Sequence, residues 1–328
     1  MKDAISELKH YDMGKFYIKA FSILLLGLSS ISLYSQQDAQ YTQYMYNTVS
    51  INPAYAGNRD VLSVVGLHRN QWVGIEGAPR TSTLSLSTPL GESRRVGLGT
   101  SIIQDDIGPS KETYLSIDFS YTIPTSEKGR LSFGLKASAQ LIDVDFSKLN
   151  INEISDPTYA TNIDNRFNPN VGVGLFYHSE KFYMGLSVPN LLETEHFDRQ
   201  NFVGNQSSGV TAQEDTNFYF ITGKVFTLSD SVLLKPVLLS KLVFGAPLQV
   251  DLSANFLIHE KFTLGAAYRW DAAFSGLAGF QVSDSIFIGL AYDRETTDLQ
   301  RFNDGSFELL LRFDLFKKYS QVITPRFF

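Results

Sequence analysis

The histidines of this 328-residue chain lack the spacing of a metal site. No HxxH or HExxH pattern, which would bring two imidazoles together, occurs in the sequence. The absence of cysteine excludes thiolate metal sites, redox pairs and disulfide scaffolds. His196 does lie among Glu193, Glu195 and Asp198, a cluster that either catches a divalent cation or is a solvated acidic loop, which is the commoner case. We therefore expect no metal and no other cofactor.

Nucleophilic catalysis has little support either. Serines are abundant and His68 falls within a predicted strand, so chance alone supplies a serine and a histidine. No GxSxG motif is present, and no predicted helix follows the Gly97-Leu98-Gly99 stretch to bind a phosphate. The sequence predicts a protein that is not an enzyme.

The segment 37–58 is harder to dismiss. It reads QDAQYTQYMYNTVSINPAYAGN and is dense in tyrosine and amide groups. A flexible leader would instead be rich in serine, glycine or charge. Tyr41, Tyr44, Tyr46, Asn52 and Tyr55 could pack into the mouth of a barrel as a plug, or the segment could be an ordered cap at the barrel base. The residues themselves leave both interpretations open.

The elements that would position this segment are strands, because period-two alternation governs the chain after residue 60. Leu115, Ile117 and Phe119, for example, alternate with polar residues. The pattern predicts about fourteen strands. They lie near 61–72, 80–88, 95–104, 112–123, 130–142, 170–178, 181–188, 216–227, 231–243, 248–257, 261–270, 272–282, 285–293 and 305–316. The ninth is the weakest because Pro236 removes a ladder donor.

The lengths of the connections between these strands follow a parity rule. Even-numbered connections are all short and polar, such as those at 179–180, 259–260 and 283–284. Every long connection is odd-numbered, and the longest are 143–169 and 189–215, followed by 294–304. A soluble β-sandwich has no reason to sort loops in this way, whereas an outer-membrane barrel has short periplasmic turns and long extracellular loops. We predict an all-β transmembrane antiparallel barrel.

The two faces of such strands meet different surroundings. Apolar faces must contact lipid, and the opposite faces are small, polar and glycine-rich. We expect those glycines to relieve crowding where the sheet curves; they include Gly97, Gly99, Gly172, Gly174, Gly185, Gly265 and Gly289. Charged residues on that side suit a wet lumen that could be open, plugged or occupied by a partner. They are Asp118, Lys136, Asp251, Arg269, Asp293 and Arg312.

The composition and the N-terminus agree with export to an envelope. A mean hydropathy near zero excludes a bundle of membrane helices, and a formal charge of −6 with 13% aromatics excludes a disordered or nucleic-acid-binding chain. Lysines followed by an apolar core around Ile23–Leu26 predict a signal peptide over 1–36, a retained single-span anchor being the alternative. The remaining expected units are the tyrosine-rich segment 37–60, a barrel over 61–316 and a periplasmic tail over 317–328.

A series of short motifs resembles the PorP/SprF family. They are QYTQYMYN at 40–47, INPAYAG at 51–57, QWVGIEGAP at 71–79, IGP at 107–109, SVPNLL at 187–192 and PRFF at 325–328. Each motif is weak alone, but together they span nearly the whole mature chain in order. We expect the motif positions to contact a partner or form the plug; they are Tyr41, Tyr44, Tyr46, Asn52, Pro53, Tyr55, Gly57, Gln71, Trp72, Gly77 and Pro79.

This resemblance implies a bacterial outer-membrane barrel of the type IX secretion system of Bacteroidetes. It implies as partner a large secreted surface protein, often an adhesin and in some members linked to gliding motility, together with secretion or periplasmic components. We expect the barrel to sit in the lipid bilayer, to bind the C-terminal domain of that partner and to bind no nucleic acid. A passive or substrate-selective porin is the alternative, and a soluble periplasmic β-protein is the third class.

Overall fold

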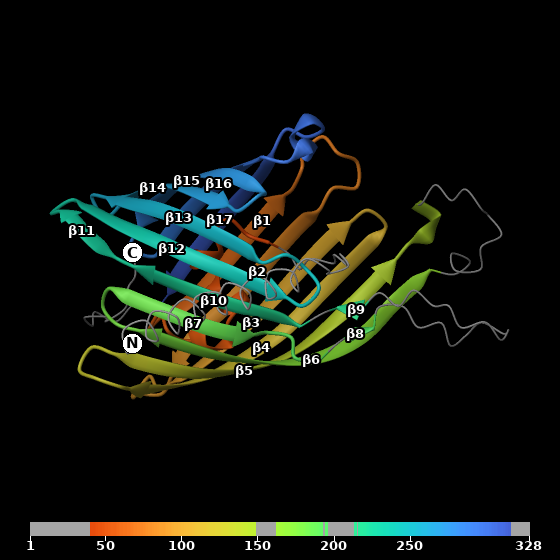
Figure 1. Cartoon of the computed structure of the whole chain (residues 1–328). Helices are drawn as coiled ribbons and strands as arrows, with labels where there is room; N and C mark the ends of the chain where they lie inside the picture. Colours follow the sequence, from red (N-terminus) through yellow and green to blue (C-terminus); the bar gives the residue numbers. More distant parts are fainter. Residues whose placement is uncertain (1–39, 149–161, 193, 196–212, 215, 316–328) are drawn as a thin grey trace, which may run out of the picture.

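The protein is a closed antiparallel β-barrel, seen in a computed structural model that describes residues 40–148, 162–192, 194–195, 213–214 and 216–315 (Figure 1). Fourteen long strands form the wall, and each pairs with its neighbours in antiparallel order. The ring closes where β1 pairs with β17 and where β10 pairs with β12. The predicted fold and strand number are therefore confirmed. The predicted signal peptide and C-terminal tail lie outside the described residues.

The bounds of the wall strands match the period-two segments to within a few residues at most ends. They are β1 (Leu62–Asn70), β2 (Arg80–Leu90), β3 (Val96–Ile107), β4 (Ser110–Pro124), β5 (Arg130–Val144), β6 (Ile163–His178), β7 (Phe182–Val188), β10 (Asn217–Lys224), β12 (Val232–Val243), β13 (Gln249–Ile258), β14 (Phe262–Arg269), β15 (Ala273–Ser283), β16 (Ile286–Glu295) and β17 (Ser306–Leu315). Three short strands complete the list, namely β8 (Thr194–Glu195), β9 (Gln213–Glu214) and β11 (Phe226–Ser229). The 3-10 helices are η1 (Tyr44–Tyr46), η2 (Thr48–Ser50), η3 (Pro53–Tyr55), η4 (Phe146–Lys148) and η6 (Asp298–Arg301).

Strand β6 begins well before its predicted start. The sequence places it at 170–178, whereas it starts at Ile163 and pairs with β5 as far as Val144. Its first residues, IDNRFNP, do not alternate in the way that reveals a strand. This part of the β5–β6 hairpin extends the wall on its long-loop side (Figure 1), where lipid does not require an apolar face.

Pro236 interrupts the sheet less than its missing N–H suggests. On one side β12 pairs with β11 at Leu234 and with β10 from Val237 onward, in one continuous register. The break between β10 and β11 falls opposite Pro236, so the missing donor lies where that ladder is already interrupted. The predicted eighth strand, 216–227, corresponds to β10 and β11 in line.

The wall separates two kinds of side chain, as the alternation predicts. Phe307, Leu309 and Leu311 on β17 point outward and are exposed, whereas the intervening Glu308 and Leu310 are buried in the barrel. The same alternation holds along β4, where Ile117 is exposed and Asp118 is buried. Among the described residues, no helix is long and apolar enough to span a bilayer.

Candidate functional site

The lumen holds the segment from Gln40 to Asp60, built as three short 3-10 turns (Figure 1). Asn52 caps the third turn, because its side-chain Oδ1 accepts a hydrogen bond from the Ala54 amide at 2.9 Å and Pro53 occupies the first helical position. Gly57 then turns the chain at a φ of +72°, a conformation that glycine adopts without strain. The chain leaves the segment directly into β1.

The tyrosines of this segment reach strands on different sides of the barrel. The Tyr41 hydroxyl hydrogen-bonds with the Thr83 hydroxyl of β2 at 2.6 Å. The Tyr55 ring packs edge-on against Phe176 of β6, with ring centroids 5.2 Å apart. Tyr44 is buried as well, and burial raises the pKa of the Tyr41 and Tyr44 hydroxyls, so both stay neutral.

Tyr46 lies in a stack of two cations and two rings. The Lys235 ammonium of β12 is 5.6 Å from the centre of the Tyr46 ring. The Tyr46 ring also packs against Phe287 of β16, with ring centroids 5.1 Å apart. The Arg312 guanidinium of β17 lies 4.8 Å from the centre of the Phe287 ring. Aromatic faces attract cations, and the attraction is strongest away from water. The segment therefore supplies the ring beside one buried cation, Lys235, and the wall supplies the ring beside the other, Arg312.

The wall glycines face this segment, which corrects our explanation of them. A Cβ at Gly97 would collide with the Ala56 carbonyl, and one at Gly174 or Gly289 would collide with the Asn52 or Gln43 side chain. These residues let the segment approach the wall. The reason is close contact with residues 43–56, and not only relief of crowding in a curved sheet. Gly172 and Gly265 instead face Pro189 and Asn255.

The six charged residues predicted to face the lumen are buried, and all six lie in ion pairs. Lys136 contacts Asp118 at 2.8 Å, and Arg269 contacts Asp251 at 2.7 Å, each between neighbouring strands. Asp293 pairs with Arg69 at 2.6 Å, and Arg312 lies 3.4 Å from Asp314. Each of these six charges therefore has a partner of opposite sign on the lumen side of the wall.

Sequence reasoning missed the charges nearest the segment. Glu308 accepts hydrogen bonds from the Thr42 amide at 2.9 Å and the Gln43 amide at 2.8 Å. Arg69 contacts the same carboxylate at 3.1 Å, and Arg59 binds Asp314 at 2.7 Å. Strand parity could have placed Arg69 and Glu308 on the inner face, but nothing in their spacing predicts that they meet.

The family motif at 71–79 forms part of the rim at the long-loop end. The Trp72 indole donates to Glu295 at 3.0 Å, and the Trp72 amide donates to the Ser306 hydroxyl at 3.1 Å. The Gln71 amide donates to the Pro79 carbonyl, closing the loop, and the Gly108 amide donates to the Gly77 carbonyl. This motif is therefore placed at the rim, away from the segment in the lumen.

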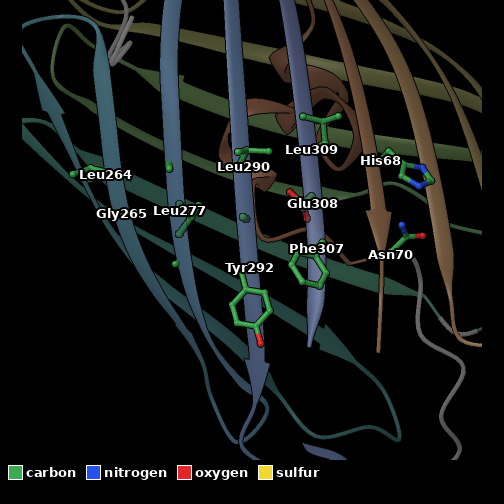
Figure 2. A pocket seen from close by; sticks show the side chains of 13 residues that line it. His68, Asn70, Leu264, Gly265, Leu277, Leu290, Tyr292, Phe307, Glu308 and Leu309 are labelled. Carbon is green, nitrogen blue, oxygen red and sulfur yellow. The ribbon is translucent and has the colours of Figure 1, made fainter. Parts of the chain in front are cut away.

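The structure has one hollow beside the segment and another on the outside of the barrel. One, of about 80 Å³, lies inside the barrel between Tyr41 and Ile51 of the segment and a wall lined by Ser116, Lys136 and Tyr219. The other, of about 550 Å³, lies on the outer surface, where Leu290 of β16 and Leu309 of β17 line it (Figure 2). Tyr292 and Phe307 lie side by side at its edge, with centroids 5.0 Å apart (Figure 2). Lipid chains cover a face of this kind.

The described part of the chain offers no support for a metal site. No group of three or more potential ligands lies together among residues 40–148, 162–192 and 216–315. Three residues of the candidate cation cluster, Glu193, His196 and Asp198, lie outside the described residues. Most of the loop 189–215 and the middle of the loop 143–169 lie outside them as well.

Comparison with known families identifies the chain. The model of the type IX secretion system membrane protein family PorP/SprF matches residues 33–313. The chain belongs to the PorP/SprF family. It is therefore an outer-membrane barrel of the type IX secretion system, and the soluble periplasmic class is set aside. A comparison with curated protein sequences gives no match.

Solved structures that resemble this PorP/SprF protein are outer-membrane barrels of low sequence identity. The CymD monoaromatic hydrocarbon channel is 13% identical, with a TM-score of 0.47 over 85% of this chain and 93% of its own. The outer membrane protein Omp33 of Acinetobacter baumannii is 10% identical, with a TM-score of 0.43 over 77% and 97%. A FadL homologue of Pseudomonas aeruginosa is 12% identical, with a TM-score of 0.39 over 77% and 88%.

Proposed function

We propose that this barrel holds a large type IX-secreted surface protein, of the adhesin kind, at the cell surface by binding its C-terminal domain at the outer mouth. Retention of this sort needs no covalent chemistry, only a large interface anchored in the membrane. In a gliding bacterium the same attachment would serve motility. Periplasmic components of the secretion system are the second partner that we propose.

One observation carries this proposal, namely that the segment 40–60 packs across the lumen. Its residues contact β2, β6, β12 and β17, which lie on different sides of the ring. We propose that it is a plug, so that the surface left for a partner is the rim with its long loops. Membership in the PorP/SprF family supports a partner from the secretion system.

The test replaces residues 196–212 of the long loop by a short Gly-Ser linker and leaves β8 and β9 in place. We expect the partner to leave the cell surface and accumulate in the medium, measured by surface labelling of intact cells and by analysis of the culture supernatant. The matched control is Lys128→Ala in the exposed Lys128–Glu180 ion pair of the short-turn end, which should leave attachment unchanged. A partner that stays attached at normal levels in the loop variant would refute the proposal.

The alternative, a passive or substrate-selective porin, makes a different prediction. A plugged barrel gives no steady conductance when the purified protein is inserted in a planar bilayer, whereas a porin conducts. Steady single-channel currents from the unmodified chain would favour the porin and would remove the reason for assigning the partner to the rim.

A further inference from the structure

The seam between the first and the last strand closes the barrel. β1 and β17 pair over nine positions, from Leu62 opposite Leu315 to Asn70 opposite Phe307. This pairing joins residues more than two hundred positions apart in the chain, so it has a high entropic cost of closure. On the inner side of this seam, two sets of buried ion pairs add to the backbone hydrogen bonds between β1 and β17.

The first set of contacts lies toward the rim. Arg69 of β1 binds Glu308 of β17 at 3.1 Å and Asp293 of β16 at 2.6 Å. Thr42 joins the same group, because its hydroxyl donates to Asp293 at 2.7 Å and accepts from Arg69 at 3.1 Å. The amides of Thr42 and Gln43 both donate to Glu308. Three strands thus meet at one point of the segment.

The second set lies at the opposite end of the seam. Arg59 lies just before the start of β1. Its side chain donates from two nitrogens to the two carboxylate oxygens of Asp314 on β17, at 2.7 and 3.3 Å. Fork-shaped contacts of this kind fix both partners in orientation. Because all these groups are buried, separating them would leave charges without partners in a medium of low dielectric.

We propose that residues 40–60 act as an internal clasp that keeps the β1–β17 seam closed against lateral opening toward the lipid. The segment contributes Thr42 and Gln43 at one end and Arg59 at the other, and β17 supplies the acid at both ends. Lys136–Asp118 and Arg269–Asp251, like Arg69–Glu308, each join two neighbouring strands directly. What the segment adds at the seam is the contacts of Thr42, Gln43 and Arg59. The clasp goes beyond the proposed function, because it concerns closure of the barrel and not its partner.

Hydrogen-exchange mass spectrometry on the full chain in detergent micelles tests the clasp, because amide exchange reports local opening of a strand pair. The variant Thr42→Val keeps the size of the side chain but removes the hydroxyl that contacts Asp293 and Arg69. We expect exchange of the β1 and β17 amides to rise by about tenfold, the effect of losing one charge-assisted hydrogen bond. Amides of β4 and β5 should exchange as in the unmodified chain.

The matched control is Asp118→Asn, which breaks a buried ion pair between β4 and β5. It should raise exchange at β4 and β5 and leave β1 and β17 unchanged. If Thr42→Val leaves the β1 and β17 amides unchanged, or raises exchange equally in every strand, the clasp is refuted and the segment is only a filler.

A disulfide tests whether the segment lies against the lumen wall at β3, since the chain has no cysteine of its own. A Cβ at Gly99 would lie 3.4 Å from the Ala56 Cβ, 3.2 Å from the Asp118 Cβ and 3.0 Å from a Val49 methyl group, so Asp118 must shift slightly. The first distance is close to the separation of about 3.5–4.5 Å found in disulfides. The triple variant Ala56→Cys, Gly99→Cys, Val49→Ala should therefore form the bond on oxidation, read by mass spectrometry. Formation of the bond would place residue 56 beside β3, as the clasp requires, and the hydrogen-exchange comparison of β1 and β17 decides the clasp itself.

Discussion

Glu308→Gln is the sharpest test of how the segment is held in the lumen. The carboxylate is 2% exposed and accepts hydrogen bonds from the Thr42 amide, the Gln43 amide and Arg69. Glutamine has nearly the same shape but only one acceptor oxygen. Its NH₂ group would face one of the two main-chain amides, so a donor would meet a donor in a buried site.

The cost follows from these contacts. Leaving one buried amide unpaired costs about 1–3 kcal/mol, and a hydrogen bond to a charged group contributes about 1.5–3 kcal/mol. Arg69 keeps Asp293 at 2.6 Å, so its charge is not left wholly unpaired. We expect the free energy of unfolding to fall by about 3–5 kcal/mol, the range found when a buried pair loses one partner.

The assay is unfolding by urea or guanidinium chloride in detergent, followed by tryptophan fluorescence. The chain has two tryptophans, and Trp72 lies at the rim end of the seam through its bond to Glu295. The control Glu180→Gln makes the same change in the exposed pair with Lys128, where a loss of about 0–1 kcal/mol is expected. If the two variants unfold within about 1 kcal/mol of each other, Glu308 does not hold the segment and our account of the lumen is wrong.

Three further predictions concern the same contacts. Gly134→Leu would collide with the Ala54 backbone and should abolish the heat-resistant folded band on unboiled gels, whereas Gly276→Ala, whose Cβ meets no atom within 4 Å, should leave it intact. Tyr46→Ala removes the ring beside Lys235 and should lower the free energy of unfolding by about 3–5 kcal/mol. Tyr46→Phe keeps the ring and should lower it by less than about 1.5 kcal/mol, and equal losses in the two variants would exclude the ring contact. Asp118→Asn leaves Lys136 without its anion and should cost about 3–5 kcal/mol; a urea midpoint equal to that of the unmodified chain would refute this.

The strands and their faces could be predicted because the membrane imposes both. Lipid on one side requires an apolar residue at every second position, as at Leu309 and Leu311, and this alternation is visible in a single sequence. Short turns such as Ser179–Glu180 mark the strand ends. Where lipid does not touch the wall the signal fades, which is why the first residues of β6 were not predicted as strand.

The contents of the lumen could be predicted only in outline. The tyrosines and amides of residues 40–58 pointed to packing, and strand parity places Arg69 and Glu308 on the inner face. Their meeting depends on the register of β1 against β17, which joins distant parts of the chain and leaves no local spacing to read. The role of Gly174 likewise depends on Asn52, a residue more than a hundred positions away.

The same geometry separates the consequences of substitutions in the lumen from those at the rim. A side chain such as Tyr46 or Glu308 contacts both the segment and the wall, so its loss is felt first in stability, as in the core of a soluble protein. A residue in the long loops can change without disturbing these contacts, so its loss should be felt first in retention of the partner. Variants that lose the partner while unfolding normally should therefore cluster at the rim, and a cluster of such variants in the lumen would mean that the partner, and not residues 40–60, occupies the barrel.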